Sequence, residues 1–427
     1  MLIIIACMDL LRYNNYIGSS SFNLVTKGMR FMNILVLGNG FDLAHGLPTK
    51  YTDFLKFVEV IKQVIEVNSS DDWQSVDWKG VHPQIEEFIR NETDRSVRNN
   101  LFCQKDKWNE LLDNNFWIEY FLECPMYRKE NWIDFENEIS NVIQSIDTDM
   151  KNSNLKLEDR VSVVSNIYLE KFFHKKLPEG VLDYGQGVDI ITFREIRDTL
   201  YHDLNRLIRI FEIYLYEYVE KIEIGTISND IKNLGIDHVL SFNYSHTYQK
   251  FYGKSKNIKY DYIHGETKGN STIENNNMVL GIDEYLSKKK KSKETDFIAF
   301  KKYYQRIYKA TGSEYKNWVD KIVTSRYANE VSLREQFPKQ IPYDKFNSKH
   351  SLYIFGHSLD ITDKDVLRDL ILNDNVYTTI YYLNKNVMGQ QIANLVKVIG
   401  HDELIRRTGG STKTIEFELQ SEMKMIS

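Results

Sequence analysis

Short apolar runs alternate along the chain with longer segments in which apolar residues recur every three or four positions. Residues 34–37 form the first run, and a glycine-rich turn at 38–48 separates it from a helical pattern over 51–65. Such runs predict buried strands, and the second spacing predicts amphipathic helices. Thr49, directly after a proline, is the expected N-cap of the first long helix. Further strands are predicted at residues 238–244, 260–264, 278–283, 351–356, 376–383 and 414–419.

Helical patterns fill most of the sequence between these runs. Residues 68–237 have a mostly helical pattern with one long helix over about 193–222, and a second helical stretch covers about 288–330. Further helices are expected near Thr362 and near Gln390. Near-continuous apolar strands that alternate with helices are typical of a buried parallel sheet. We therefore expect an α/β protein with a Rossmann-like, doubly wound, mostly parallel sheet and large helical inserts.

The expected sheet is assembled from three separated parts of the chain. Two helical inserts interrupt it, and an N-terminal extension, expected to be poorly ordered, precedes it. The predicted order is the extension 1–31, the first part of the Rossmann-like domain 32–67, a helical insert 68–235, the domain continued 236–284, a second helical insert 285–345 and the domain completed 346–427.

The first eight residues are apolar, but they lack the basic region of a signal peptide and are too short to span a bilayer. No other segment of the sequence is apolar enough to cross a membrane. Met29 or Met32 is the expected natural start, which would make residues 1–31 an ill-specified tail. The basic run at 288–291 is most simply a solvated loop.

Charge and cysteine content narrow the class of protein. A net charge of -5 over 427 residues disfavours non-specific binding to nucleic acid. The three cysteines, Cys7, Cys103 and Cys124, are too few and too far apart for a disulfide framework or a four-cysteine zinc site. This cysteine usage suits a reducing compartment, so we expect a cytoplasmic protein without a metal ion.

Polar residues follow the ends of the predicted strands. Ligands of open parallel sheets bind beyond the carboxyl ends of the strands, so these residues are candidates for one site. Taken singly, each has a structural explanation: Asn243 as a turn residue, His264 as a core histidine and Asp42 as a helix cap. Convergence on one cleft would favour function instead. The candidates are Asn39, Asp42, Ser241, Asn243, His264, Asp283, His357 and Ser358.

The order and spacing of these strand-end motifs resemble those of sirtuins. Sirtuins show G-A-G-x-S, three further residues and G-I-P, where this chain has G-N-G-F-D at 38–42 and G-L-P at 46–48. Sirtuins then show Q-N-x-D, H-G and G-T-S-L. This chain has F-N-Y-S at 242–245, H-G at 264–265 and G-H-S-L at 356–359, in the same order.

The resemblance implies a SIR2-like fold with NAD as the ligand. Asn243 would position the nicotinamide ribose or a water, and His264 would act as general base. Gly38, Gly40 and the following helix would face the pyrophosphate, while Gly356 and Ser358 would meet the adenosine half. The catalytic set is therefore His264, Asn243 and Asp42. The binding set is Gly38, Asn39, Gly40, Phe41, Gly356, His357 and Ser358.

Three departures from the sirtuin pattern narrow the reaction. Asp42 replaces a small hydroxyl residue, Ser245 replaces the acid of Q-N-x-D, and Thr49 stands where sirtuins carry an arginine. The cysteines are also too few for the sirtuin zinc module. These differences disfavour protein deacylation and leave NAD hydrolysis at the nicotinamide–ribose bond.

A longer resemblance is to the bacterial abortive-infection AbiH family. It lies in N-I-L-V-L-G-N-G-F-D-L at 33–43, W-I-D-F-E at 132–136, Q-R-I-Y at 305–308 and G-H-S-L-D at 356–360. It extends from about Met32 to near the C-terminus. It implies defence against bacteriophage, in which an infected cell stops growing or dies.

Three acidic residues in the second of these motifs allow two interpretations. Asp134, Glu136 and Glu138 would lie in the first turn of a helix, with Asp134 and Glu138 on one face. In the first interpretation, a carboxylate from this turn reaches over the cleft and stabilises a ribosyl cation. Alternatively, the acids favour the helix dipole alone, and this second interpretation is preferred.

The sequence leaves other functions open. In one alternative, the chain is a sensor that holds a nucleotide without turnover and signals through its helical inserts. In another, it is a metal hydrolase that uses Asp42, His264, Asp283 and His357. The expected partner is a nucleotide small molecule, with a phage-derived trigger and a second copy of the chain left open. No membrane partner is expected, and nucleic acid is disfavoured.

Overall fold

The computed structural model describes residues 31–66, 75–92, 105–161, 166–176, 191–253, 257–285, 293–336 and 349–426. The expected N-terminal tail, apart from Phe31, and the basic run at 288–291 lie outside these residues.

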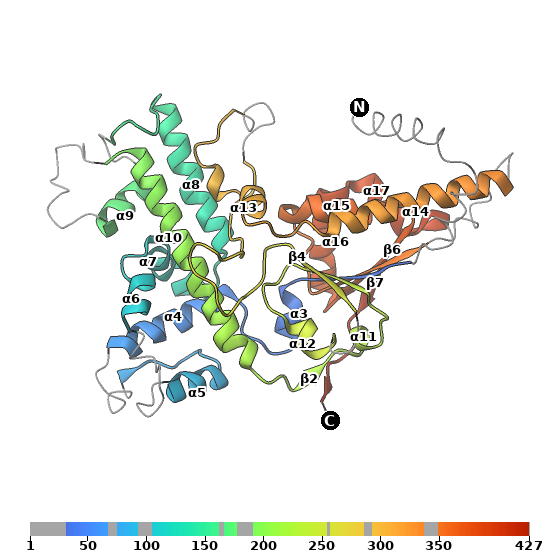
Figure 1. Ribbon diagram of the computed structural model, residues 1–427, viewed down its shortest axis with the longest axis horizontal. Helices are drawn as coiled ribbons and strands as arrows, with labels where there is room; N and C mark the ends of the chain where they lie inside the picture. The colour runs from blue at the N-terminus through green and yellow to red at the C-terminus, as the bar shows by residue number, and fades with distance from the viewer. Residues whose placement is uncertain are drawn as a thin grey trace.

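A six-stranded sheet, parallel throughout, is the centre of the half of the protein drawn at the right of Figure 1. Its spatial order is β4-β3-β1-β5-β6-β7. Counted within this sheet alone, that is the 3-2-1-4-5-6 order of a doubly wound Rossmann fold. The expected fold class is therefore confirmed. The strands are β1 (Asn33–Leu37), β3 (His238–Ser241), β4 (Lys259–Tyr262), β5 (His350–Phe355), β6 (Val376–Tyr382) and β7 (Ile415–Leu419).

The apolar run of β1 is buried on both faces, as the sequence predicts for a central parallel strand. Side chains alternate across a strand, and here Ile34 and Val36 join one hydrophobic core while Leu35 and Leu37 join another. The helices on the two faces supply the partners. These are α11 (Asn229–Lys232), α12 (Thr247–Phe251), α14 (Tyr315–Gln336), α15 (Lys364–Ile371), α16 (Lys385–Ile399) and α17 (His401–Thr408).

A helical region lies beside the sheet and is drawn at the left of Figure 1. Its longest helix, α10, is capped by reciprocal hydrogen bonds between Thr192 and Glu195. It continues into a π-helical turn (Tyr214–Tyr218) and a 3-10 turn (Val219–Lys221), close to the predicted span of 193–222. The helices are α4 (Tyr51–Glu66), α5 (Pro83–Glu92), α6 (Lys105–Leu112), α7 (Phe116–Glu123), α8 (Phe135–Asn152), α9 (Ile167–Lys176) and α10 (Phe193–Ile213).

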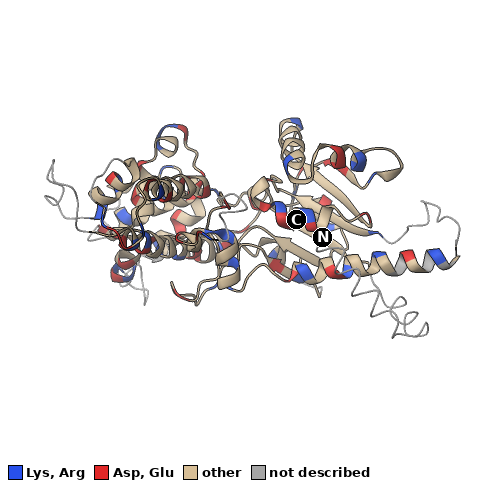
Figure 2. Cartoon of the chain, turned by 90° about the horizontal axis from the view of Figure 1, so that it is seen from above, with Lys and Arg blue, Asp and Glu red and all other residues tan. Residues whose placement is uncertain are grey.

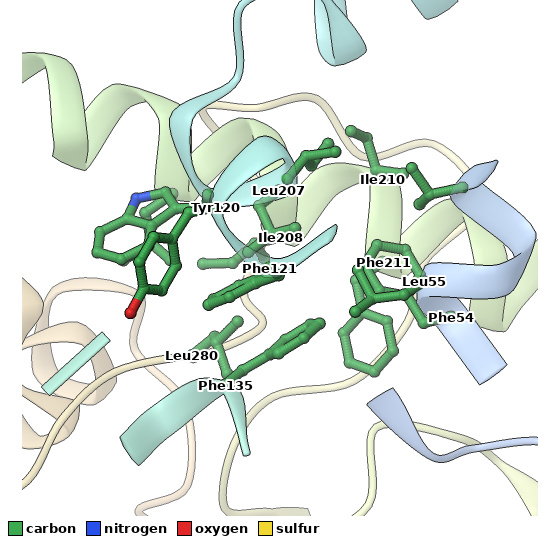
Figure 3. Close-up of a cluster of buried hydrophobic side chains, with 14 of the residues drawn as sticks. Phe54, Leu55, Tyr120, Phe121, Phe135, Leu207, Ile208, Ile210, Phe211 and Leu280 are labelled. Carbon is green, nitrogen blue, oxygen red and sulfur yellow. The ribbon is translucent and has the colours of Figure 1, made fainter. Parts of the chain in front are cut away.

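Aromatic side chains form the centre of the helical region (Figure 3). The Phe135 ring stacks on Phe121 and on Tyr51, with 4.2 Å between ring centroids in each pair. Phe54 and Phe211 meet edge to face nearby, at 4.9 Å. Because these rings come from α4, α7, α8 and α10, aromatic packing holds distant segments together and fixes the start of α8.

The predicted strand at 278–283 is wrong. Ile282 forms one isolated bridge with Lys301, and the segment belongs to no strand of the sheet. Met278, Leu280 and Ile282 are buried in the core of the helical region instead. The run is apolar because it crosses between the two parts of the protein, where its backbone amides find single partners such as the Gln305 side chain.

Two helix predictions also change in the structure. Helix α4 begins at Tyr51, and Thr49 does not cap it, because its hydroxyl donates to Asn39 Oδ1 at 2.6 Å. The expected helical stretch over 288–330 is divided between α13 (Lys302–Tyr308) and α14. Gly312 lies in the connection at a φ of 65°, a conformation that ends a helix.

Charges of both signs are interspersed in the view of Figure 2, along α14 and across the helical region. Within the described ranges, none of the helices is both long and apolar enough to span a bilayer.

Candidate functional site

A cavity of about 600 Å³ opens at the carboxyl ends of the central strands. In the sheet, Leu37 pairs with Ser241 on one side and Phe355 on the other, so the turns after these residues lie side by side. This is the switch point of the doubly wound order, where such folds bind ligands. The helical region supplies the opposite wall. Five residues predicted to share a cleft line the cavity: Asn39, Asp42, Asn243, His264 and His357.

The glycines of the two central turns pack backbone against backbone. The amide of Gly38 donates to the Phe355 carbonyl at 3.1 Å, and that of Gly40 donates to the Gly356 carbonyl at 2.9 Å. A Cβ on Gly356, whose φ is 68°, would lie 2.2 Å from the Phe41 nitrogen. The glycines are thus explained by the close approach of the two turns, and the two amides that were expected to face a pyrophosphate already have partners within the chain.

Two members of the predicted binding set have structural contacts of their own. The Phe41 side chain is buried and packs against Phe355, with ring centroids 5.8 Å apart, outside the cavity lining. Asn39 lines the cavity, but its amide donates to the Thr49 carbonyl at 3.4 Å and its oxygen accepts from the Thr49 hydroxyl. Gly38, Gly40, Gly356 and Ser358 line the cavity directly.

Asp42 is a buried carboxyl group in the cavity wall. It lies within α3 (Asn39–Ala44), whose N-cap is Gly38, so the alternative explanation of Asp42 as a helix cap does not hold for this helix. Its Oδ2 accepts a hydrogen bond from Ser245, and its buried Oδ1 has no partner among the described residues. Burial raises the pKa of Asp42 to about 6, and the hydrogen bond from Ser245 offsets this only in part.

Asn243 joins the end of β3 to the turn after β1. Its Nδ2 donates to the Gly38 carbonyl at 3.0 Å, and its backbone amide donates to the Ser241 hydroxyl at 3.1 Å. The side chain is therefore held at the cavity wall in one orientation. Ser241 supports this turn from behind and lies outside the cavity lining.

The floor of the cavity holds a carboxylate between two histidines. Asp363 Oδ1 lies 3.4 Å from His264 Nε2, and Asp363 Oδ2 lies 3.4 Å from His357 Nε2. The Leu359 amide donates to His357 Nδ1 at 2.9 Å, so a neutral His357 carries its proton on Nε2, facing Asp363. His264 Nδ1 is buried and has no partner among the described residues. His264 therefore has one nitrogen held by an acid and one without a partner.

The environment keeps Asp363 ionised. Burial alone would raise its pKa, but hydrogen bonds from His264 and His357 and the charge of Lys302 hold the pKa well below its usual range. Sequence reasoning missed this residue, because Asp363 follows the last motif by three residues and sits in a 3-10 turn (Ile361–Asp363) beyond the predicted strand. The signal for it is the pattern H-S-L-D-x-x-D that follows Gly356.

Glu136 and Lys302 bring charge from the helical side. Lys302 Nζ lies 2.7 Å from Glu136 Oε2, and both residues line the cavity. Burial would lower the pKa of Lys302, but the carboxylates of Glu136 and Asp363 raise it above its usual value, so Lys302 stays cationic. Sequence reasoning missed Lys302, because a lysine in a predicted helix carries no signal of its burial.

The acids of the W-I-D-F-E motif separate in the structure. Asp134 caps α8 by accepting from the Asn137 amide at 3.2 Å, and Glu138 accepts from the Tyr120 hydroxyl at 2.7 Å. Of the three acids, Glu136 is the one that pairs with Lys302 in the cavity, although Asp134 also lines it. Asp134 is thus the N-cap of α8 and Glu136 and Glu138 lie in its first turn, where the preferred interpretation places the acids, while Glu136 also pairs with Lys302 in the cavity.

The lining of the cavity is acidic. Lys302 is its one ammonium group among the described residues, whereas the carboxylates are Asp42, Asp134, Glu136, Asp360 and Asp363. Asp283 lies outside the lining, and in the described parts of the chain no three His, Cys, Asp or Glu side chains are placed to hold a metal ion. The four residues proposed for a metal hydrolase therefore do not all come together in the cavity. The carboxylates that do line it favour a ligand or transition state that carries positive charge.

A family model for bacteriophage abortive infection AbiH proteins matches residues 34–382, more than three quarters of the 427-residue chain. No curated protein matches the chain. The matched span contains both glycine turns, the histidines and acids of the cavity floor, and the helical wall with its W-I-D-F-E motif. The chain therefore belongs to the bacteriophage abortive infection AbiH family, which implies a role in defence against phage by abortive infection.

Proposed function

We propose that the chain acts in abortive infection by hydrolysing NAD at the nicotinamide–ribose bond. The observation that carries the proposal is the floor of the cavity, where Asp363 holds His264, together with the buried carboxyl of Asp42 in the wall of the same cavity. Breaking this bond develops positive charge on the ribose ring. Fixed carboxylates in a site shielded from water stabilise such charge, so an acidic cavity suits this transition state.

The proposed step uses one water molecule. His264 takes a proton from the water as the water oxygen forms a bond to the anomeric carbon of the ribose. The bond to the nicotinamide nitrogen breaks, and its electron pair goes to that nitrogen, which loses its positive charge. The products are nicotinamide, ADP-ribose and the proton, which leaves His264 for solvent.

The cavity residues have distinct proposed roles in that step. Asp363 orients the His264 ring and stabilises its protonated form. Asp42, as a carboxylate, faces the ribosyl cation, and Asn243 orients the ribose or the water. His357, fixed by Leu359, holds Asp363 from its other side.

Two departures from the sirtuin pattern support the proposal. Asp42 stands where that pattern has a serine, and Ser245 stands where it has an acid. In the folded chain these two side chains are hydrogen-bonded to each other. This chain thus has one serine–aspartate pair at the cavity wall, with each residue type at the position where the sirtuin pattern has the other.

A second candidate function is a nucleotide sensor without turnover. Glu136 of α8 and Lys302 of α13 meet in the cavity wall, so an occupant would contact helices of both inserts. The partnered amides of Gly38 and Gly40 also leave fewer donors for a pyrophosphate than a dinucleotide enzyme commonly offers.

Nicotinamide release separates the two candidates. Purified chain is incubated with NAD, with and without extract of phage-infected cells, and nicotinamide and ADP-ribose are measured by chromatography. The enzyme proposal predicts equal amounts of both products and their loss in His264→Ala and Asn243→Ala. Binding of NAD with no product in either condition would favour the sensor and defeat the enzyme.

A further inference from the structure

The loop before α8 presents an aromatic ring at the mouth of the cavity. Trp132 lines the cavity, yet 51% of its surface is exposed. The tryptophans Trp108, Trp117 and Trp318 are buried, at 4% exposure or less. Within the described residues, the Trp132 ring forms no aromatic pair and no contact with a cation. A ring this large, left open beside a cavity, is a surface for stacking.

The other residues of the W-I-D-F-E motif have structural or charge-pairing partners. Ile133 is buried, Asp134 caps α8, Phe135 stacks on Phe121, and Glu136 pairs with Lys302. Folding therefore accounts for four positions of the five. Trp132 is the position that folding does not explain, because exposing an indole gains nothing in stability.

Contacts of the backbone hold the loop that carries Trp132. A π-helical turn (Met126–Glu130) precedes it, and Asn131 adopts a left-handed φ of 49°. The Trp132 amide donates to the Met126 carbonyl at 3.4 Å, and the buried Ile133 side chain anchors the loop on the other side. A loop whose backbone is already held loses little conformational entropy when a ligand stacks on its side chain.

We propose that Trp132 stacks on the heteroaromatic base of a nucleotide at the mouth of the cavity. The class of ligand rests on the proposed function, but the stacking itself needs no turnover. His264 and His357 of the floor are buried and the Asp363 side chain is only 13% exposed, so the reacting ribose lies inside and the stacked base lies nearer solvent. The ring thereby favours binding of a ligand that carries a flat base, compared with a sugar phosphate that has no base.

Binding of ADP-ribose tests the stacking, because this ligand is not consumed. Calorimetry is run on the full chain, on Trp132→Ala and Trp132→Phe, and on the control Tyr308→Ala, which removes a ring that is 71% exposed and lies outside the cavity lining. Trp132→Ala should weaken ADP-ribose binding roughly five- to hundred-fold. Trp132→Phe should weaken it less, and Tyr308→Ala should leave it unchanged.

Two further measurements make the result specific to a base. Ribose 5-phosphate, which lacks a base, should bind wild type and Trp132→Ala alike, and comparison of AMP with nicotinamide mononucleotide shows which base stacks. ADP-ribose should quench part of the tryptophan fluorescence of wild type, and this quenching should be lost in Trp132→Phe.

Different results would contradict the stacking proposal and the hydrolysis proposal. Equal ADP-ribose affinity in wild type and Trp132→Ala would overturn the stacking even if NAD is hydrolysed. Affinity that depends on Trp132, without release of nicotinamide from NAD, would support the stacking and defeat the hydrolysis. The stacking would also be overturned if the wild-type chain bound no nucleotide. It would be overturned likewise if Trp132→Ala weakened binding of a protein partner but not of nucleotides.

Discussion

The two walls of the cavity are built in different ways. On the sheet side, two glycine turns pack backbone to backbone, and each functional residue lies within a few positions of a strand end. On the helical side, Trp132 and Glu136 come from one motif and Lys302 from a segment far away in sequence, and aromatic packing and one ion pair hold these segments together. The first wall is set by local backbone geometry and the second by tertiary packing. The two should therefore respond differently to substitution.

The largest effect is expected at the contact between the two glycine turns. Gly356→Ala places a Cβ 2.2 Å from the Phe41 nitrogen at a φ of 68°, so both the backbone and the neighbouring turn must shift. We expect the free energy of unfolding to fall by roughly 3–5 kcal/mol, measured by urea denaturation. The matched control is Gly389→Ala in α16, where an added Cβ meets nothing within 4 Å and should stabilise the helix by about 0.5–1 kcal/mol. Equal stability in both variants would show that the turns are not tightly coupled.

The next effect separates chemistry from architecture on the sheet side. His264→Ala should lower the rate of nicotinamide release by roughly 10²- to 10⁴-fold, because the general base is lost. The fold should be kept, at a lower thermal unfolding temperature, because Asp363 loses one of its two histidine partners. His401→Ala, whose side chain is 70% exposed, is the control and should keep full activity. A His264→Ala variant with full activity would remove His264 from the reaction.

Asp42 tests whether a functional residue of the sheet wall lowers the stability of the fold. Its pKa of about 6 lies above the usual value of 3.8, so the folded state favours the protonated form. The ionised carboxyl then destabilises the fold above pH 6, and this cost fades as the pH falls through 6 and is absent below the usual value. Asp42→Asn should therefore raise the free energy of unfolding by about 2–3 kcal/mol at pH 8 and hardly at all at pH 3.5.

The same substitution should also lower turnover at every pH. Wild-type turnover should fall as the pH drops below 6, because the Asp42 carboxylate becomes protonated. Stability curves that are parallel across this pH range in wild type and Asp42→Asn would contradict the buried, partly unpartnered carboxyl.

The smallest effect is expected at the ion pair of the helical wall. Glu136→Gln leaves the ammonium of Lys302, which is 8% exposed, without its nearest counter-charge. We expect a loss of about 1–3 kcal/mol in the free energy of unfolding at neutral pH, less than for a fully buried pair, since Glu136 is partly open to solvent. Glu330→Gln breaks the exposed pair with Arg334 and should cost below about 1 kcal/mol. Equal costs in the two variants would mean that the cavity ion pair is solvated like a surface pair.

The same contrast explains how much the sequence predicts. The fold class and the six strands of the sheet follow from apolar runs, and the strand-end residues Asn39, Asp42, Asn243, His264 and His357 come together because parallel strands end at one edge. The prediction for 278–283 fails because a segment buried between two parts of a protein is as apolar as a strand buried in a sheet.

The helical wall could not be predicted in the same way. Lys302 and Glu136 meet only after α8 and α13 pack, and nothing in the sequence near either residue indicates the other. Asp363 is intermediate, since it lies just beyond a recognised motif but in a turn whose direction depends on His264 and His357. The glycines are a third case: the sequence predicts their tight turn, while their partner, a second glycine turn, lies more than three hundred residues away.

The most direct test of the proposed function compares nicotinamide release from NAD by wild type and by Asp363→Asn, with extract of phage-infected cells present. The Asn side chain keeps the size of the floor residue but removes the charge that orients His264. Hydrolysis predicts stoichiometric nicotinamide and ADP-ribose from wild type and a large loss in the variant, with NAD still bound. Intact NAD with the wild-type chain, or equal release by both proteins, would contradict it.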